Sequence, residues 1–299
     1  MRVKVAVPAT VANLGAGFDV FAMALQLQNE VSVASNDSGA LTIDPGADAP
    51  GELCDPERNL VTRAFMHAER ALGVEHAGAD FTWVTRIPMS RGLGSSAAAA
   101  LAGVLSAVAL HHAPWDEHDV IDCAAALEGH RDNAAAALLG GLAVCAPGAQ
   151  AVRIDVPDEL RAVLFLPEQT LPTQASREVV PRQLSRDDAV FNASRCALFV
   201  RALMARDWNS LGVAMEDRWH QAARSALAPH VPRLIEAARE AGAAGAALAG
   251  AGPSVIALVT GDHSPVEAAM RDRAAAEGVS GTTLVLPPRN FGARVDVRP

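Results

Sequence analysis

The sequence predicts a two-domain protein in which strands and helices mix, of the α+β or α/β class. Both halves of the 299-residue chain contain short runs that alternate apolar and polar residues, which is typical of half-buried strands. Longer runs rich in Ala and Leu lie between them and favour helix. Half of the residues are hydrophobic, enough for two modest cores. The Pro-Gly-Ala-Gln segment at 147–150 indicates a boundary, so we expect domains over 1–148 and 149–299.

In the first half, the N-terminal run Arg-Val-Lys-Val-Ala-Val alternates like a strand, and a glycine-containing loop at 8–19 and an apolar stretch to Leu25 follow it. A loop rich in Pro, Gly and Asp spans 44–58. Asp132 can cap a helix that Gly140 and Gly141 stop. In order, the predicted strands are 2–7, 29–34, 40–43, 81–87 and 142–146, and the predicted helices are 59–72, 95–112, 115–128 and 132–139.

In the second half, a polar loop with Pro172 and Pro181 separates the first strands from a helical region. The segment 246–258 reads as a glycine turn that leads into a strand. No repeat of 20–50 residues is present. In order, the predicted strands are 152–156, 162–166, 254–258, 281–286 and 293–297, and the predicted helices are 187–206, 208–223, 231–242 and 264–277.

Composition excludes several classes of function. The net charge is −9, with arginines scattered singly, so we expect no nucleic-acid or anionic-membrane surface. The four cysteines are far apart and show no C-x-x-C spacing, which is typical of buried free thiols in a reducing compartment. The N-terminus lacks a signal-peptide apolar core, and no run is apolar enough to span a membrane. These features predict a cytoplasmic protein.

The segment 87–100 has the order strand, glycine-rich loop, helix N-terminus, with Ser95 or Ser96 available as a cap. Free amides and the positive end of a helix dipole would face this loop, which favours a phosphate. Three interpretations compete: a tight turn, a dinucleotide fingerprint, and a nucleotide triphosphate loop. The second lacks its acidic residue on a following strand, and the third is not a Walker A loop, because G-K-[ST] is absent.

Three other motifs have both a local and a functional interpretation. Asn13 and Asp19 lie among glycines and fit simple turn chemistry. The segment Glu-Gly-His-Arg-Asp-Asn at 128–133 fits either a cap-rich turn or a corner where a carboxylate binds Mg²⁺. Arg177 and Arg224 fit surface charges, or a carboxylate clamp if the fold brings them together. A further glycine turn, at 250–254, is weak by itself.

Four of these segments, 8–19, 88–98, 128–133 and 248–254, occur in an order that resembles the GHMP kinase superfamily, and the first and third resemble its homoserine kinase branch. The resemblance implies an α+β fold of two domains, the first similar to domain 2 of ribosomal protein S5 and the second ferredoxin-like. The departures are few: Thr10-Val11, Ala16, Phe21-Ala22 and Arg131 stand where the family usually has Ser-Ser, Pro, Leu-Gly and Pro.

The resemblance implies ATP-dependent phosphorylation of the L-homoserine hydroxyl, as in threonine biosynthesis, by a protein that is commonly a homodimer. Ser96 and Glu128 would lie near Mg²⁺, Asp19 would orient the hydroxyl, and the two arginines would hold the carboxylate at the other end. Competing hypotheses are another GHMP kinase, acting on a sugar, mevalonate or shikimate, and a non-catalytic ATP-binding regulator. The implied ATP-binding residues are Asn59, Pro88, Met89, Ser90, Arg91, Gly92, Leu93, Gly94, Ser95, Ser96, Ala97 and Ala98, and the implied substrate-binding residues are Asn13, Asp19, His130, Asn133, Thr173, Arg177 and Arg224.

Overall fold

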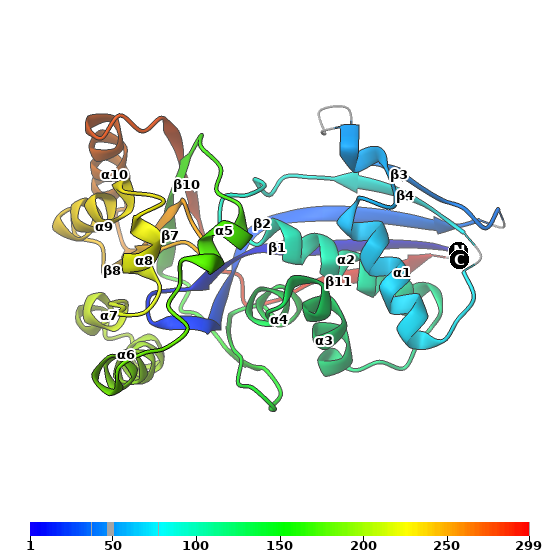
Figure 1. Ribbon diagram of the computed structural model, residues 1–299, viewed down its shortest axis with the longest axis horizontal. Coiled ribbons are helices and arrows are strands. Elements are labelled where there is room, and N and C mark those ends of the chain that lie inside the picture. Colours follow the sequence, from blue (N-terminus) through cyan, green and yellow to red (C-terminus); the bar gives the residue numbers. More distant parts are fainter. Residues whose placement is uncertain (37, 47–50, 77, 299) are drawn as a thin grey trace.

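The chain folds into two lobes that lie side by side along the long axis of the molecule (Figure 1). The structure is a computed structural model that describes residues 1–36, 38–46, 51–76 and 78–298. A seven-stranded sheet forms the first lobe and a four-stranded sheet the second. The mixture of helices and strands in each lobe is the predicted α+β class.

Two long antiparallel strands form the centre of the first sheet. They are β1 (Arg2–Asn13) and β2 (Gly17–Ser35), so the predicted strands 2–7 and 29–34 are parts of longer ones. Pro8 does not end β1, because the pairing register shifts between Pro8 and Ala9, and a bulge tolerates a residue without an N–H. The sheet order is β11-β1-β2-β4-β3, and β5 and β6 extend from β2. The remaining strands are β3 (Leu41–Asp44), β4 (Ala79–Val84), β5 (Leu142–Val144), β6 (Val152–Ile154) and β11 (Arg294–Arg298).

Helix α2 (Ser95–Leu110) is the central helix of this lobe. It is buried around almost its whole circumference, as expected for a helix that is apolar on all sides. Gly103 lets it approach α1 closely, since a Cβ there would lie 2.1 Å from the Val61 carbonyl oxygen. The other helices of the lobe are η1 (Gly51–Cys54), α1 (Leu60–Leu72), α3 (Glu117–Glu128) and α4 (Asp132–Leu139).

The second sheet has the strand order β10-β7-β9-β8, with every neighbouring pair antiparallel. Numbered within the lobe, this is fourth-first-third-second, and the succession βαββαβ completes the expected ferredoxin-like topology. The strands are β7 (Leu160–Pro167), β8 (Gly245–Leu248), β9 (Val255–Thr260) and β10 (Gly281–Leu286). The helices are α5 (Thr173–Glu178), α6 (Arg186–Ala205), α7 (Trp208–Ala214), α8 (Gln221–Ser225), α9 (His230–Glu240) and α10 (Ser264–Ala276).

One apolar core joins the two lobes. Ala162, Leu164 and Leu166 on one face of β7 belong to the core cluster of the first lobe. Val163 and Phe165 on its other face belong to a second cluster with residues of α9 and α10. The alternation of β7 therefore contributes side chains to both clusters.

The sheets do not divide at the predicted boundary after residue 148. Strand β6 pairs with β5, and β11 returns from the second lobe to pair with β1, so both complete the first sheet. The N- and C-terminal ends consequently lie beside each other at the far end of the first lobe (Figure 1). The division 1–148 and 149–299 stays a prediction for the domains, but residues 294–298 pack with the first.

Three predicted elements are wrong. The loop expected over 8–19 is strand except at residues 14–16, because β1 continues to Asn13 and β2 begins at Gly17. The helix expected over 208–223 is interrupted between α7 and α8, because Asp217 accepts hydrogen bonds from the amides of His220 and Gln221 and starts a new helical turn. The polar loop between Pro172 and Pro181 contains the short helix α5. In the expected loop 44–58, η1 forms at 51–54, and residues 47–50 lie outside the described residues. No helix in the described ranges has both the length and the apolarity needed to cross a bilayer.

Candidate active site

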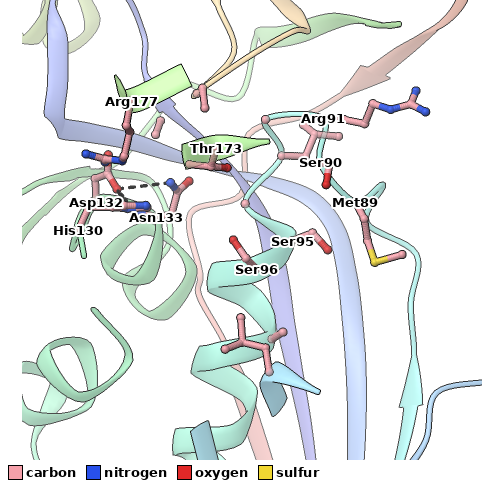
Figure 2. A pocket seen from close by; sticks show the side chains of 18 of the residues that line it. Met89, Ser90, Arg91, Ser95, Ser96, His130, Asp132, Asn133, Thr173 and Arg177 are labelled. Atoms are coloured by element: carbon pink, nitrogen blue, oxygen red, sulfur yellow. Dashed lines mark hydrogen bonds and ion pairs between the residues drawn. The ribbon is translucent and has the colours of Figure 1, made fainter. Parts of the chain in front are cut away.

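A cavity of about 280 Å³ lies where the two lobes meet. The loop before α2, the start of α2 and the start of α4 line it from the first lobe, and α5, α8 and the Gly250 turn line it from the second. Figure 2 shows residues from both sides facing it. The predicted site residues that line it are Asn13, Asp19, Met89, Ser90, Arg91, Gly92, Leu93, Gly94, Ser95, Ser96, His130, Asn133, Thr173, Arg177 and Arg224.

The N-terminus of α2 is open toward this cavity. Gly94 occupies the N-cap position with φ of 66°, and no side chain caps the helix, so the prediction that Ser95 or Ser96 caps it is wrong. The first intrahelical bond runs from the Ala98 amide to the Gly94 carbonyl. The amides before Ala98 therefore keep their hydrogens for a ligand, and the positive end of the helix dipole adds to their attraction for an anion.

Glycines shape this loop by close packing as well as by conformation. A Cβ on Gly94 would lie 2.0 Å from Thr10 Oγ1, and one on Gly92 would lie 2.1 Å from the Ala249 carbonyl oxygen. Thr10 Oγ1 in turn donates a 2.7 Å hydrogen bond to Asn133 Oδ1. The loop is thus fixed against β1, α4 and the turn before Gly250, and Gly94 is required for these contacts in addition to any contact with phosphate.

Ser96 and Glu128 meet at the start of α2. Ser96 Oγ donates a 2.6 Å hydrogen bond to Glu128 Oε2, and the Ser96 hydroxyl points into the cavity (Figure 2). Among the described residues, no group of three or more His, Cys, Asp or Glu side chains is arranged to hold a metal ion. Mg²⁺, however, needs only one or two hard oxygen ligands from the protein when phosphates supply others, so a hydroxyl and a carboxylate in contact fit this ion.

The other end of the loop meets an apolar wall. Trp83, Met89 and Leu53 line this part of the cavity, and Leu60 and Ala99 complete it. Of these, only Met89 was predicted from the sequence, because the apolar residues come from β4, η1, α1 and α2, which are separated along the chain. The alternation at 81–87 carried a signal for Trp83, since it places Phe81 and Trp83 on one buried face.

Four predicted ATP-binding residues do not line the cavity, and one that does has its charge engaged elsewhere. Asn59 is fully buried, accepts from the Val61 amide and donates to the Leu53 carbonyl, so it caps α1 and anchors the wall rather than facing the ligand space. Arg91 lines the cavity, but its guanidinium donates to the carbonyls of Pro167 and Glu168. The remaining three, which lie behind the lining residues, are Pro88, Ala97 and Ala98.

Asp132, at the start of α4, does not cap this helix, contrary to the prediction. Arg131 takes the N-cap position, and the Asp132 carboxylate, 1% exposed, accepts from the Asn133 amide and lies 2.9 Å from His130 Nδ1. Burial alone would lower the pKa of His130, but the hydrogen bond and the charge of Asp132 outweigh it and raise this pKa. Asp132 therefore directs His130 and favours its protonated form at the edge of the cavity.

The structure brings Arg177 and Arg224 together, as the clamp hypothesis requires. Both guanidinium groups lie over the ring of Phe18, with centroid distances of 5.7 and 5.1 Å, and both line the cavity. Arg224 is 2% exposed, and burial, with the charge of Arg177, lowers its pKa to about 10, so it remains a cation at neutral pH. Phe18 was not predicted, because it follows a glycine loop and resembles an ordinary core residue.

Asp19 lies at the same end as these arginines. Its two carboxylate oxygens accept from Arg177 at 2.6 and 3.1 Å in a bidentate pair, and its amide donates to Asn13 Oδ1. The expectation that Asp19 and the arginines lie at opposite ends of the substrate is therefore wrong. This end of the cavity combines two cations and one anion, which is the charge pattern that complements an α-amino acid head group.

Comparison with known proteins gives a consistent result. The family model described as "GHMP kinases N terminal domain" matches residues 59–141, and "GHMP kinases C terminal" matches residues 199–277. A homoserine kinase of Desulfitobacterium hafniense is 38% identical over 98% of this chain and 99% of its own length. The crystal structure of homoserine kinase from Cytophaga hutchinsonii superposes with a TM-score of 0.87 at 29% identity, covering 99% of this chain and 97% of the other. A mevalonate kinase structure with a TM-score of 0.69, 13% identical over 96% of this chain and 99% of its own, shares the fold.

Proposed function

The chain belongs to the GHMP kinase family, and we propose that it phosphorylates the side-chain hydroxyl of L-homoserine with ATP as the phosphoryl donor. Relatives named homoserine kinase match it along nearly their whole length at 32–38% identity, which supports this substrate. ATP is the donor that the family uses. The product of this reaction would be O-phospho-L-homoserine and ADP.

One observation carries the proposal: the uncapped N-terminus of α2 and the charged side chains of Arg177, Arg224 and Asp19 line the same cavity. The open N-terminus of α2 supplies amides for the phosphates, next to an apolar wall that suits a purine base. Arg177, Arg224 and Asp19 supply the opposite end with charges that complement a carboxylate and an ammonium group. A small amino acid with a nucleophilic group on its side chain fits both ends.

Ser96 and Glu128 would hold Mg²⁺ between these two ends. Their contact places a hydroxyl and a carboxylate beside the free amides of α2, where phosphates would arrive. When bound, the ion supplies charge neutralisation for the transferred phosphoryl group, whose transition state is loose. The protein then has to position two reactants and exclude water, and it does so with the packed walls of the cavity.

The hydroxyl of homoserine would lie near His130 and Asn133. Asn133 Oδ1 lies close to both Thr10 and the Gly94 position, next to the phosphate loop, and His130 is influenced by the charges of both Glu128 and Arg177. These two side chains therefore lie between the phosphate loop and the head-group end, which is the part of the cavity lined by Arg177, Arg224 and Asp19. We assign them to orientation of the hydroxyl, and we assign Asp19 to the ammonium group of the substrate instead of the hydroxyl.

The proposal is tested by measuring ADP release in the presence of Mg²⁺ and a panel of small alcohols: L-homoserine, homoserinol, mevalonate, galactose and shikimate. We expect turnover with L-homoserine at least a hundredfold above that with the others, since only it presents both an amino acid head group and a primary hydroxyl at the right reach. A preference for mevalonate, a sugar or shikimate would replace the substrate while keeping the kinase family. ATP binding without turnover of any alcohol would favour the regulator hypothesis.

The chain is expected to act as a homodimer and to work in the cytoplasm. Sedimentation analysis of the purified protein decides the first, and fractionation of cells decides the second.

A further inference from the structure

His220 lies behind the head-group end of the cavity and contacts Arg224 directly. It precedes α8, it is fully buried, and Arg224 lies one helical turn after it. Its ring lies 5.2 Å from the ring of Phe18, over which the Arg224 guanidinium also lies. His220 is not among the residues that line the cavity, so its effect on a substrate is indirect, and Arg224 is the lining residue to which it is hydrogen-bonded.

The partners of His220 fix the form of its ring. Nδ1 lies 3.1 Å from Arg224 Nη1, and a guanidinium nitrogen can only donate, so Nδ1 must be an unprotonated acceptor. Nε2 must therefore carry the hydrogen, which it donates to the Gly15 carbonyl at 2.8 Å. Burial, together with the charge of Arg224, lowers the pKa of His220 to about 4 despite the opposing carboxylates of Asp217 and Asp19, so the neutral ring persists at neutral pH.

The contacts of Arg224 show what this acceptor does. Nε donates to the Ser176 carbonyl at 3.0 Å, and Nη1 donates to His220 Nδ1 and to the Gly250 carbonyl at 3.1 Å each. Three of the five N–H donors of a guanidinium are then engaged, and the two on Nη2 remain. Within the described part of the chain, no hydrogen-bond partner meets Nη2, and Arg224 lines the cavity.

We propose that His220 is a positioning residue that holds the Arg224 guanidinium in the orientation that presents Nη2 to the carboxylate of the substrate. It does so as a neutral acceptor on Nδ1 while its Nε2 donates to Gly15 in the turn between β1, which ends at Asn13, and β2, which carries Asp19. His220 thereby fixes the position of Arg224, in the second lobe, relative to Asp19, in the first. This inference rests on the proposed function for its kinetic consequence, but the restraint on Arg224 exists without substrate.

Two substitutions test the hydrogen bonds of the two ring nitrogens one at a time. In His220→Asn, the amide oxygen takes the place of Nδ1 as an acceptor for Arg224, and the bond to Gly15 is lost. In His220→Gln, the amide nitrogen takes the place of Nε2 and keeps the bond to Gly15, while the acceptor for Arg224 is lost. His230→Gln is the matched control, because His230 is buried in the same lobe and its Nε2 contacts the Pro253 carbonyl at 3.0 Å.

The kinetic readout is the ratio of kcat/KM for L-homoserine to that for homoserinol, which lacks the carboxylate. We expect His220→Gln to lower this ratio on the order of tenfold, through the KM for homoserine with kcat nearly kept, because a hydrogen bond to a charged group is lost. We expect His220→Asn and His230→Gln to change it by less than about threefold. A merely structural role would instead lower kcat/KM for both compounds by the same factor, in proportion to the loss of folded protein, and leave the ratio unchanged.

The second readout needs no substrate. In ligand-free protein with ¹⁵N-labelled arginine, we expect slow rotation and slow hydrogen exchange of the Arg224 side-chain N–H groups in the wild type and His220→Asn, and faster exchange in His220→Gln. Unchanged exchange in a folded His220→Gln protein would overturn the inference. If the wild type phosphorylates no homoserine, the proposed function fails, and this readout alone then decides the role of His220.

Discussion

The two ends of the cavity are built in different ways. The end that we propose binds phosphate, at the start of α2, consists mainly of the main chain of one continuous segment: glycines with positive φ, free amides and a helix dipole. At the head-group end, the side chains come from β2, α5 and α8, and their positions depend on contacts between the lobes. A site made of main-chain amides keeps its ligand contacts when many of its side chains are replaced. The head-group end, by contrast, loses a ligand contact whenever one of its contacting side chains is replaced.

We expect the largest effect from replacing Glu128, the one acidic side chain that we assign to the phosphate end. Glu128→Gln should lower kcat by a hundredfold or more, because it removes a charged oxygen ligand of Mg²⁺. ATP affinity measured without Mg²⁺ should stay nearly unchanged. Glu117→Gln, in the first turn of the same helix α3, is the control and should have little effect. Wild-type turnover in Glu128→Gln would return this residue to a helix-end role.

At the head-group end, Arg224→Ala should lower kcat/KM for L-homoserine by about thirty- to a hundredfold, equivalent to roughly 2–3 kcal/mol for a truncated charge pair. The variant should also distinguish homoserine from homoserinol far less than the wild type does. Arg224→Lys should not restore this discrimination, since an ammonium group cannot reproduce the forked contacts to Ser176, His220 and Gly250. Discrimination as strong as in the wild type would mean that the carboxylate binds elsewhere.

Two glycines with nearly the same backbone conformation allow the cost of the left-handed conformation to be measured separately from the effect of close packing in the loop before α2. Gly94 and Gly73 have φ of 66° and 68°, but a Cβ on Gly73 meets nothing within 4 Å, whereas one on Gly94 overlaps Thr10 Oγ1. Each substitution by Ala should cost about 1 kcal/mol of folding stability for the left-handed conformation. Only Gly94→Ala should also weaken ATP binding, by about tenfold, as seen by calorimetry, because the start of α2 must move. Equal ATP affinities in the two variants would contradict the close packing of this loop.

The smallest expected effect is a change in one pKa between the two ends. In Asp132→Asn, the pKa of His130 should fall, because burial then acts without the opposing carboxylate. NMR titration of the His130 ring measures this shift. Because the folded-state pKa of His130 is raised, its stabilisation is complete at pH values below its unfolded-state pKa and is lost as the pH rises through the folded-state pKa. An unchanged pKa would show that Asp132 does not control the ring.

Most of the fold could be predicted because its elements are locally encoded. The strand predicted at 281–286 is β10 with the observed bounds, and the alanine-rich run after Gly94 gives α2. The helix break after Ala214 could not be predicted, because it depends on Asp217, whose other carboxylate oxygen is held by Asn192 on α6. Side-chain contacts between distant segments of the chain leave no periodic pattern in the sequence.

In the candidate site, too, some features could be predicted from the sequence and others could not. The loop before α2 and the contact of Ser96 with Glu128 agree with what the motifs implied. The pairing of Asp19 with Arg177 and the capping role of Asn59 were missed, because each depends on which oxygen or amide lies within reach in the folded chain. Trp83, Phe18 and His220 were missed for another reason: as single apolar or aromatic residues they are indistinguishable from core residues until the cavity is known.

The return of β11 to the first sheet has a consequence for synthesis. The ribosome makes β11 after the whole second lobe, yet its partner β1 is among the first segments to emerge. Until then, β1 has a free edge along the residues that later pair with 294–298, and free strand edges are where chains associate wrongly. The first sheet therefore cannot be completed while the second lobe is being made, and β1 remains its edge strand until β11 has been synthesised.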